Sequence, residues 1–385
     1  MPEDRKTIAV VIGTRPEAIK LAPVIRELKR DTARYDVKVV ATAQHRELLD
    51  RVLALFEIET DVDLDIMRAD QDLFGVTQKA LGGLGKAFAE LGPDLVLVQG
   101  DTTSVFAGAL AAFYHQIPVA HVEAGLRTEQ RYSPFPEEIN RHLTGVLTDL
   151  HFAPTSKAAW NLRHEGYDES QITITGNTVI DALLDVADRE EAPLPEGVDP
   201  DKPLILVTAH RRESFGAPLE RAFGALAELA KMHPEAQIVY PVHPNPKVQK
   251  AAKDNLSAST NIILLEPMDY APFVSLMKRA TLVLTDSGGI QEEAPSLGVP
   301  VLVLRPVTER PEAVGAGTVK LVGTDPAKII GEAHRLLTDA DYHASMAAAV
   351  NPYGDGKASE RIAAVISHFF FKTDRPADFT VEDDA

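Results

Sequence analysis

An arginine follows the first glycine turn of the chain, at a position where an anion could bind. The apolar run 8–12 ends at Gly13, and Arg15 then opens a helical pattern that carries Lys20. Glycine permits a tight turn, and the amides and dipole at a helix start favour a phosphate, to which Arg15 can donate two hydrogen bonds. A plain turn with a surface arginine is the alternative. The single glycine matches neither the dinucleotide fingerprint nor the Walker phosphate loop.

A second strand-to-helix turn, Ser287-Gly288-Gly289, has the composition of a diphosphate site. Its backbone amides and the Ser287 hydroxyl can surround phosphate oxygens. Glu293 follows one helical turn later and would repel a phosphate, but its carboxylate could accept hydrogen bonds from ribose hydroxyls. The alternative is an ordinary helix start, where acidic residues are favoured by the helix dipole.

Three carboxylates stand where acid–base chemistry could use them. Asp101 and Glu123 each follow an apolar strand pattern, and Glu137 comes directly after a proline. A charge beside a buried strand is expensive unless it has partners or a function, and a carboxyl group with a raised pKa can donate a proton. The alternatives are a helix cap for Asp101 and a first-turn helix position for Glu137. For Glu123 the alternative is an ion-pair network with His121 and Arg127.

A histidine and two arginines directly follow the predicted strand 203–209. His210 is followed by Arg211 and Arg212, a pattern that indicates anion binding beside a titratable imidazole. Arg310 lies near another strand end and adds a further cation. A structural role for this group is the alternative.

These residues require a scaffold that brings strand ends together. Apolar, β-branched runs alternate with amphipathic helical patterns, and the predicted strands are 7–13, 37–42, 94–98, 117–122, 150–154, 203–209, 236–242, 261–267, 280–286 and 299–305. Such alternation predicts parallel sheets covered by helices on both faces. We therefore predict an α/β fold of two Rossmann-like doubly wound domains, with the strand ends facing an interdomain cleft.

The long helical pattern at 357–372 is apolar on one side and is expected to cross back to the first domain. The segment 191–203 is rich in proline and acid and is predicted to be an exposed connection. The predicted domains are 1–176 plus 358–375, then 177–357, with a flexible tail at 376–385.

Composition and missing motifs exclude several kinds of site and argue against some classes of partner. The chain has 385 residues, a formal net charge of -18 and no cysteine, which excludes disulfides and thiolate metal sites. The acidity argues against nucleic acid as a partner, because a phosphate backbone requires a basic surface. No zinc-binding motif or nucleophile elbow is present. No apolar stretch suits a membrane span or a signal peptide, so we expect a cytoplasmic protein. Because the dinucleotide fingerprint and metal-binding motifs are missing, we expect neither a nicotinamide nor a metal cofactor.

Long motifs in a fixed order resemble the non-hydrolysing UDP-N-acetylglucosamine 2-epimerases, over about residues 7–370. They include GTRPEAIKLAP, TAQHRELLD, QGDTTS, HVEAGLRT, PFPEEINR, TAHRRES, TDSGGIQEEAPSLGVPVLVLR and TERPEA. The resemblance implies the glycosyltransferase-B arrangement of two Rossmann-like domains, the second of which binds UDP. It also implies reversible conversion of UDP-N-acetylglucosamine (UDP-GlcNAc) to UDP-N-acetylmannosamine (UDP-ManNAc). In the implied route, UDP is eliminated to leave 2-acetamidoglucal and is then added back, which supplies a precursor for cell-surface polysaccharide.

The resemblance also carries residue roles onto this chain. Those implied for catalysis are Asp101, Glu123, Glu137 and His210; those implied for substrate binding are Arg15, Lys20, Met268, Phe273, Ser287, Gly288, Gly289, Glu293 and Arg310. Which carboxylate removes the C2 proton and which one returns it stays open. Met268 stands where relatives often have glutamine, so only a backbone hydrogen bond to uracil is expected there.

Two further expectations come from the resemblance alone, a homodimer and an activating second molecule of UDP-GlcNAc. The contacts implied for that activator are Gln44, His45, Arg68, Arg212 and His243. The alternatives that stay open are a hydrolysing epimerase that releases ManNAc and UDP, a glycosyltransferase, and a non-catalytic nucleotide-sugar sensor.

Overall fold

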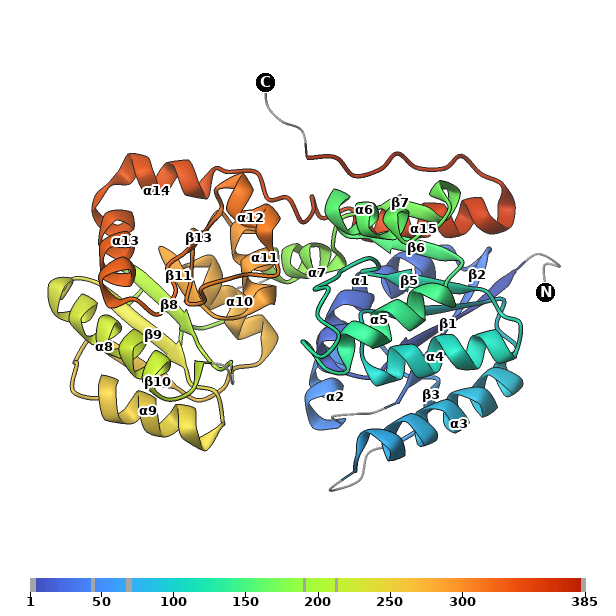
Figure 1. Cartoon of the computed structure of the whole chain (residues 1–385), viewed down its shortest axis with the longest axis horizontal. Coiled ribbons are helices and arrows are strands. Elements are labelled where there is room, and N and C mark those ends of the chain that lie inside the picture. The colour runs from blue at the N-terminus through green and yellow to red at the C-terminus, as the bar shows by residue number, and fades with distance from the viewer. Residues whose placement is uncertain (1–4, 43–45, 67–70, 190–191, 212–213, 382–385) are drawn as a thin grey trace. The chain divides into compact units, whose positions relative to one another are not determined.

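A computed structural model describes residues 5–42, 46–66, 71–189, 192–211 and 214–381 (Figure 1). The chain forms two compact units, unit 1 (Met1–Ala182 with Tyr353–Ala385) and unit 2 (Leu183–Pro352). These boundaries differ from the predicted ones at 176 and 358. The physical reason is local: Asn177 N donates to Tyr353 O at 2.6 Å, so the chain on both sides of the expected boundaries packs within unit 1.

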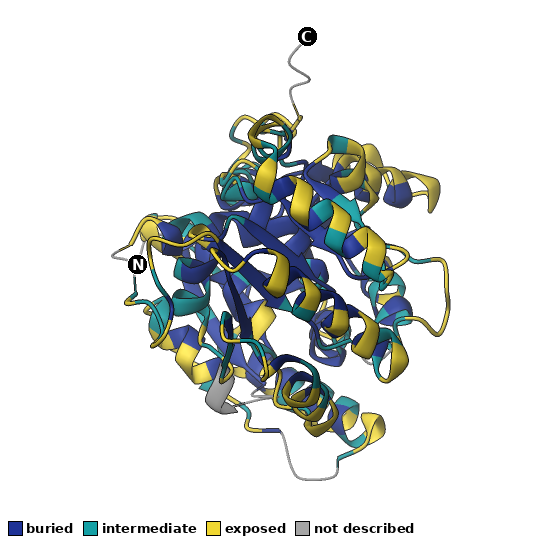
Figure 2. Ribbon diagram, turned by 90° about the vertical axis from the view of Figure 1, so that its left-hand side faces the viewer, coloured by how far each residue is buried: buried dark blue, intermediate teal, exposed yellow. Residues whose placement is uncertain are grey.

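Unit 1 is built on a seven-stranded sheet of order β3-β2-β1-β4-β5-β6-β7, in which every pair is parallel. Its strands are β1 (Lys6–Ile12), β2 (Tyr35–Ala41), β3 (Val62–Asp63), β4 (Leu95–Gln99), β5 (Val119–Val122), β6 (Leu150–Ala153) and β7 (Ile172–Ile174). The central strands read as continuous apolar runs because helices cover both faces of a parallel sheet. Figure 2 shows this layering, with buried strands between helices whose outer faces are exposed.

The helices of unit 1 follow the alternation that the sequence predicts. They are α1 (Arg15–Arg30), α2 (Arg46–Leu55), α3 (Leu73–Leu91), α4 (Thr103–Tyr114), α5 (Glu137–Val146), α6 (Ser156–His164), the start of α7 (Thr178–Ala187), and α15 (Ala358–Phe371), with a short 3-10 helix at Glu169–Gln171. Apolar residues of α3 and α4, such as Leu84 and Phe88, pack with Val11 and Val98 of the sheet. The C-terminal helix α15 packs against α1 within unit 1.

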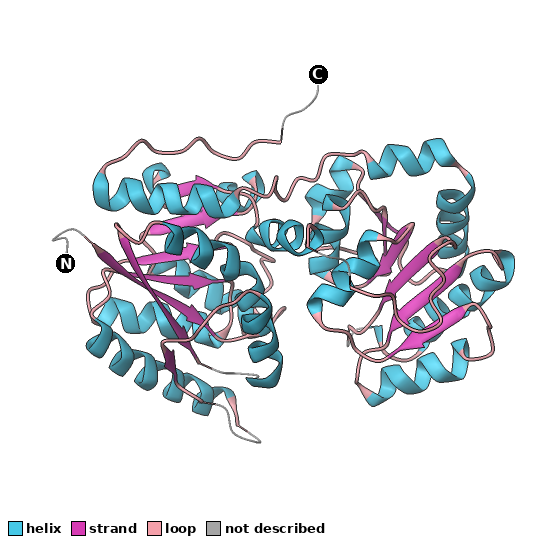
Figure 3. Cartoon of the chain, turned by 180° about the vertical axis from the view of Figure 1, so that it is seen from behind, coloured by secondary structure: helices cyan, strands magenta, loops and turns pink. Residues whose placement is uncertain are grey.

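Unit 2 repeats the arrangement with six parallel strands in the order β10-β9-β8-β11-β12-β13 (Figure 3). Its strands are β8 (Leu204–Thr208), β9 (Gln237–Pro241), β10 (Ile262–Leu265), β11 (Leu282–Thr285), β12 (Val301–Val303) and β13 (Val319–Leu321). Its helices are α8 (Ala217–Met232), α9 (Pro246–Leu256), α10 (Tyr270–Lys278), α11 (Gly288–Ser296), α12 (Pro311–Ala316), α13 (Pro326–Thr338) and α14 (Ala340–Ala347). The largest buried side chains of its core include Tyr240 and Phe223.

Strand order reverses once in each sheet, between β1 and β4 in unit 1 and between β8 and β11 in unit 2. In doubly wound sheets, ligands bind at the carboxyl ends of the strands beside this reversal. The turns that follow these strands carry Gly13 and Asp101 in unit 1, and His210 and Ser287 in unit 2. The fold therefore places the sequence-predicted residues at the expected edge of each sheet, and the predicted fold class of two Rossmann-like units is confirmed.

Three short strands, β3, β7 and β13, were not among the predicted ones. The predicted flexible tail at 376–385 is also wrong for its described part, up to residue 381. Phe379 is buried and its N donates to Ile174 O at 2.7 Å, while Asp378 Oδ1 accepts from Ile174 N at 2.9 Å. The segment is thus tied to strand β7 in unit 1. Within the described residues, no helix is both long enough and apolar enough to cross a membrane.

Candidate functional site

The turn from β1 to α1 is organised by the buried carboxylate of Glu17. Its Oε2 accepts hydrogen bonds from Gly13 N at 2.5 Å and Thr14 N at 3.3 Å. Its Oε1 accepts from Thr14 Oγ1 at 3.1 Å and Thr102 Oγ1 at 2.8 Å. The amides of Gly13 and Thr14 are therefore not available to a phosphate, contrary to expectation, because the Glu17 carboxylate in the capping box of α1 accepts from them. Arg15 is exposed on the first turn of the helix.

Burial raises the pKa of Glu17 from 4.5 to about 7, although the hydrogen bonds from Gly13, Thr102 and Thr14 oppose the rise. All of its donors are uncharged, so desolvation of the carboxylate is the larger effect. The side chain joins the β1–α1 turn to the β4–α4 turn, the two turns that present Arg15 and Asp101.

This raised pKa predicts a specific pH dependence of stability. The folded protein binds the Glu17 proton more tightly than the unfolded chain, so the stabilising effect of protonation is complete below about pH 4.5 and is lost as the pH rises to about 7. Relative to Glu17→Gln, which does not titrate, the wild type should lose on the order of 3 kcal/mol of unfolding free energy across that interval. Urea unfolding of both proteins at several pH values measures this difference. Glu27→Gln, in the same helix, should follow the wild type, and parallel wild-type and Glu17→Gln curves would contradict the assignment.

Glu123 is a second buried acid of unit 1. It follows β5 and has a backbone φ of 64°, a conformation that is uncommon for a residue other than glycine. Lys20 Nζ lies 2.5 Å from Glu123 Oε1, Asn177 Nδ2 donates to the same oxygen at 3.2 Å, and Gln99 Nε2 donates to Oε2. The predicted substrate residue Lys20 thus pairs with the predicted catalytic residue Glu123.

The alternative of an ion-pair network holds for Glu123 in part, because the acid pairs with Lys20 and its charge also acts on His121. Arg127 instead binds Glu165, with Nε to Oε1 at 2.6 Å. The His121 ring donates from Nε2 to Gly100 O at 2.7 Å, and burial lowers its pKa to about 4. His121 is therefore a neutral imidazole that supports the turn before Asp101.

Asp101 is held by helix α5. Arg141 Nη2 donates to its carboxylate, and Asn140 Nδ2 donates to its backbone carbonyl at 3.0 Å. The helix-cap alternative for Asp101 is wrong, because the hydroxyl of Thr102 caps α4 by accepting from Val105 N at 3.4 Å. The Asp101 side chain is instead paired with Arg141.

The same α5 carries the two acids after Pro136, and they differ in environment. Glu137 is half-buried on the first turn, as its alternative predicted. Glu138 is buried, and burial opposes its ionisation. Hydrogen bonds from Thr128 and Glu129 amides and the Arg141 guanidinium nevertheless hold its pKa below the usual 4.5. Glu138 was missed from the sequence, and it anchors the Arg141 that binds Asp101.

In unit 2, the start of α11 has the features of an anion site. The helix begins at Gly288, directly after Ser287, so its first amides have no partners within the helix. A Cβ at Gly288 would lie 3.8 Å from Arg211 Nη2 and 3.8 Å from Arg310 Nη2, so two guanidinium groups flank this residue. Among the described residues, the buried Nε of Arg211 has no hydrogen-bond partner. Helix dipole and guanidinium groups together favour a phosphate here.

Arg310 is held in place by a buried acid of α11, Glu292. Arg310 Nε donates to Glu292 Oε1. The pairing orients the guanidinium and leaves its Nη2 beside Gly288. Glu292 was not predicted from the sequence, where it looked like one of several first-turn acids.

The residues expected to hold the nucleoside lie along α10 and α11. Glu293 is buried, and its Oε1 accepts a hydrogen bond from Tyr270 Oη at 2.8 Å. Burial, followed by the nearby Glu293 carboxylate, raises the pKa of Tyr270 well above its usual value, so this hydroxyl stays a donor. Phe273 is half-buried in the first turn of α10, and Met268 lies half-buried between β10 and that helix.

His210 forms a dyad with an aspartate that the sequence did not single out. Asp286 Oδ2 accepts from the backbone amides of His210 and Arg211 at 2.8 Å, and its Oδ1 lies 3.4 Å from His210 Nδ1. The Asp286 carboxylate therefore lies beside the His210 imidazole. His243, predicted to contact an activator, stacks on His210 with ring centroids 5.2 Å apart.

The other residues predicted to contact an activator, Gln44, His45, Arg68 and Arg212, lie outside the described residues. Of the residues that sequence reasoning missed, Gln99 and Asp286 stand inside quoted motifs beside assigned residues, and that adjacency was the available signal. Within the described ranges, no group of three or more histidines or acids could hold a metal ion.

Comparison with known proteins gives a consistent result. A family model described as UDP-N-acetylglucosamine 2-epimerase matches residues 26–367. The chain is 55% identical over 370 residues to a UDP-N-acetylglucosamine 2-epimerase of Yersinia pestis, covering 94% of this chain and 98% of that protein.

Solved structures agree with this comparison. A Listeria monocytogenes protein matches with a TM-score of 0.92 and 48% identity, covering 98% of this chain and 100% of that one. A UDP-GlcNAc 2-epimerase of Neisseria meningitidis, solved with UDP-GlcNAc bound, matches with a TM-score of 0.85 and 47% identity. That match covers 95% of this chain and 100% of the other.

Proposed function

The chain belongs to the UDP-N-acetylglucosamine 2-epimerase family, and we propose that it interconverts UDP-GlcNAc and UDP-ManNAc without net hydrolysis. The observation that carries the proposal is the Glu123 cluster, a carboxylate held by Lys20, Gln99 and Asn177 at a strand end in a chain of this family. A UDP-GlcNAc complex of a relative 47% identical supports the substrate class.

The chemistry has to invert a carbon whose proton is not acidified by a neighbouring carbonyl. Cleaving the C1–O bond first gives C1 oxocarbenium character, which makes the C2 proton easier to remove. The C1–O electron pair leaves with UDP, a base takes the C2 proton, and the C–H electron pair forms the C1–C2 double bond of 2-acetamidoglucal. Protonation of C2 from the other face and attack of UDP oxygen on C1 complete the epimerisation.

The residues of unit 1 suit the proton transfers. A Lys20 ammonium at 2.5 Å and two amide donors stabilise the ionised form of Glu123, so we assign it the base. Asp101 is likewise paired, with Arg141. Glu137, half-buried at the start of α5, is assigned the proton return to the opposite face.

The residues of unit 2 suit the leaving group. The start of α11 with Arg211 and Arg310 would carry the pyrophosphate, and fixed donors of this kind stabilise charge as it develops on the departing oxygen. Glu293, whose Oε1 accepts from Tyr270, would accept a hydrogen bond from the ribose. His210, oriented by Asp286, would contact the phosphate that leaves.

Incubation of the protein with UDP-GlcNAc in deuterated water tests the proposal. We expect deuterium at C2 of both recovered nucleotide sugars, because the proton that returns comes from a group that exchanges with solvent. Mass spectrometry and proton NMR measure the label. Free ManNAc and UDP as the main products would instead establish the hydrolysing reaction. Intact, unlabelled substrate would point to a glycosyltransferase or a sensor.

The product would supply mannosamine units for cell-surface polysaccharide, and we propose a homodimer as the working assembly. Both proposals rest on family membership. Which glycan receives the product is a property of the enzymes that consume it.

A further inference from the structure

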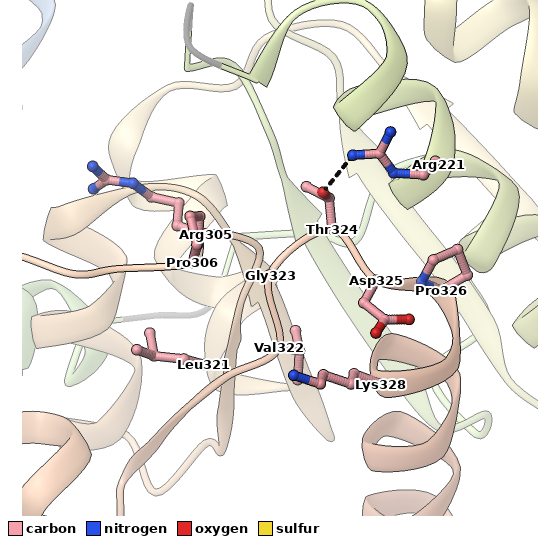
Figure 4. Close-up of a pocket in the computed structure, with 10 residues that line it drawn as sticks. All are labelled: Arg221, Arg305, Pro306, Leu321, Val322, Gly323, Thr324, Asp325, Pro326 and Lys328. Atoms are coloured by element: carbon pink, nitrogen blue, oxygen red, sulfur yellow. Dashed lines mark hydrogen bonds between the residues drawn. The ribbon is translucent and has the colours of Figure 1, made fainter.

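Unit 2 contains a cavity of about 540 Å³ that the proposed reaction does not use. It lies beyond the carboxyl ends of β12 and β13, where Arg305 and Pro306 follow the first strand and residues 321–324 end the second (Figure 4). Arg221 of α8 and Lys328 of α13 complete the wall. None of these residues belongs to the candidate site.

The charged groups around the cavity are predominantly basic. Arg221 Nη2 donates to Thr324 Oγ1 at 3.2 Å, which orients the guanidinium along the wall. Lys328 and Arg221 are both exposed, whereas Arg305 is buried and pairs with Glu309 at 3.8 Å. In a chain with a net charge of -18, three cations around one cavity differ from the general surface composition.

The lining contains one acid, Asp325. Asp325 Oδ1 accepts from Ala327 N at 3.0 Å as the cap of α13, and its carboxylate offsets one of the three cations. The cations of the wall are therefore only partly neutralised from within the cavity.

Size and apolar lining indicate more than an isolated phosphate ion. Pro306, Leu321 and Pro326 contribute apolar surface. Small-molecule sites typically enclose about 300–1,000 Å³, with apolar walls and a few placed polar groups. An inorganic phosphate would fill a small part of this volume, so the remainder suits the sugar or base of a larger molecule.

We propose that this cavity binds a phosphorylated small molecule of nucleotide or sugar-phosphate size. Arg221 and Lys328 bind the phosphate, and the apolar wall contacts the rest of the ligand. Arginine presents a planar set of donors that matches phosphate oxygens, and lysine adds a point charge. The proposal concerns unit 2 alone and is independent of the epimerase reaction.

Isothermal titration of the full chain with ADP and, separately, with glucose 6-phosphate tests the proposal and distinguishes a nucleotide from a sugar phosphate. The pocket variant is Arg221→Ala/Lys328→Ala, and the control is Lys231→Ala/Lys250→Ala, which removes the same charge from exposed positions of unit 2. We expect saturable binding of at least one probe, weakened about tenfold or more in the pocket variant and within about twofold of wild type in the control. Single Lys328→Ala, at an exposed position, should give a smaller loss in the same direction.

Binding that is equal in the pocket and control variants would place the probe elsewhere and overturn the proposal, as would failure of both probes to saturate the wild type. Epimerase turnover is not the readout, so loss of the proposed function would leave this result unaffected. Thermal unfolding of each variant shows whether its fold is retained.

Discussion

Glu123→Gln should slow deuterium incorporation at C2 and lower kcat, each by roughly a hundredfold to ten-thousandfold, the range that loss of a positioned acid or base costs. The substitution retains the size of the side chain and an oxygen for the amide donors Gln99 and Asn177. It removes the carboxylate that is proposed to accept the C2 proton. Measurement of kcat, KM and C2 exchange on the same preparation separates a chemical defect from a binding defect.

A structural role makes a different prediction for the same variant. Loss of Glu123 leaves Lys20 in a largely buried position without its carboxylate, which destabilises the fold when a pair is broken in this way. If the acid served only as an ion-pair partner, the folded fraction of Glu123→Gln would turn over normally. Retained UDP binding with strongly slowed C2 exchange is the result that supports catalysis.

Glu129→Gln is the matched control. Glu129 is also a glutamate in the left-handed region, with φ of 60° against 64° for Glu123, but its side chain is exposed. Any cost of placing glutamine in that backbone conformation is common to both variants. Glu129→Gln should therefore keep wild-type kcat, and a comparable loss there would remove the argument for Glu123.

The fold could be predicted because its signals are local. Apolar runs such as those of β1 and β4 alternate with helical patterns, and parallel sheets follow from that alternation. The strands that were missed, β3, β7 and β13, have two or three residues each, which is too short for a periodic pattern to register. The tail was misjudged for a related reason, since only the docked position of Phe379 against β7 reveals that it is bound.

The site could be predicted in its residues but not in its pairings. The residue types at Gly13 and Arg15 predict a turn that binds an anion. In the structure the Gly13 and Thr14 amides donate to the Glu17 carboxylate, and sequence spacing does not reveal whether a side chain or a ligand accepts from them. Lys20 and Glu123 are far apart in sequence and meet only because β1 and β5 belong to one sheet. Pairings of this kind depend on strand order.

The same reasoning explains why Asp286 escaped notice. It is the last residue of the predicted strand 280–286, directly before Ser287, and its position in the sequence indicates no role beyond starting the turn. In the structure its carboxylate reaches across to the turn after β8, which is its neighbour in the sheet. Such contacts between neighbouring strand ends follow from the order of the parallel strands, which the local sequence does not reveal.

Arg310→Ala should lower kcat/KM by about a hundredfold to a thousandfold, the range found when a preorganised donor to developing charge is removed. Arg310 flanks the first residue of α11, where the departing pyrophosphate gains charge as the C1–O bond breaks. Because that charge is greater in the transition state than in the bound substrate, kcat should fall more than the affinity for UDP-GlcNAc does. Initial rates of UDP-ManNAc formation over a range of UDP-GlcNAc concentrations give kcat and KM, which measure the two quantities. Removal of Arg310 leaves the buried Glu292 without that partner, so Arg310→Ala/Glu292→Gln is needed as well. A purely structural Arg310 would recover activity in that double variant, whereas a residue that stabilises the leaving group would not.

Arg335→Ala is the control for loss of an arginine from unit 2. It removes an exposed arginine and should keep wild-type rates.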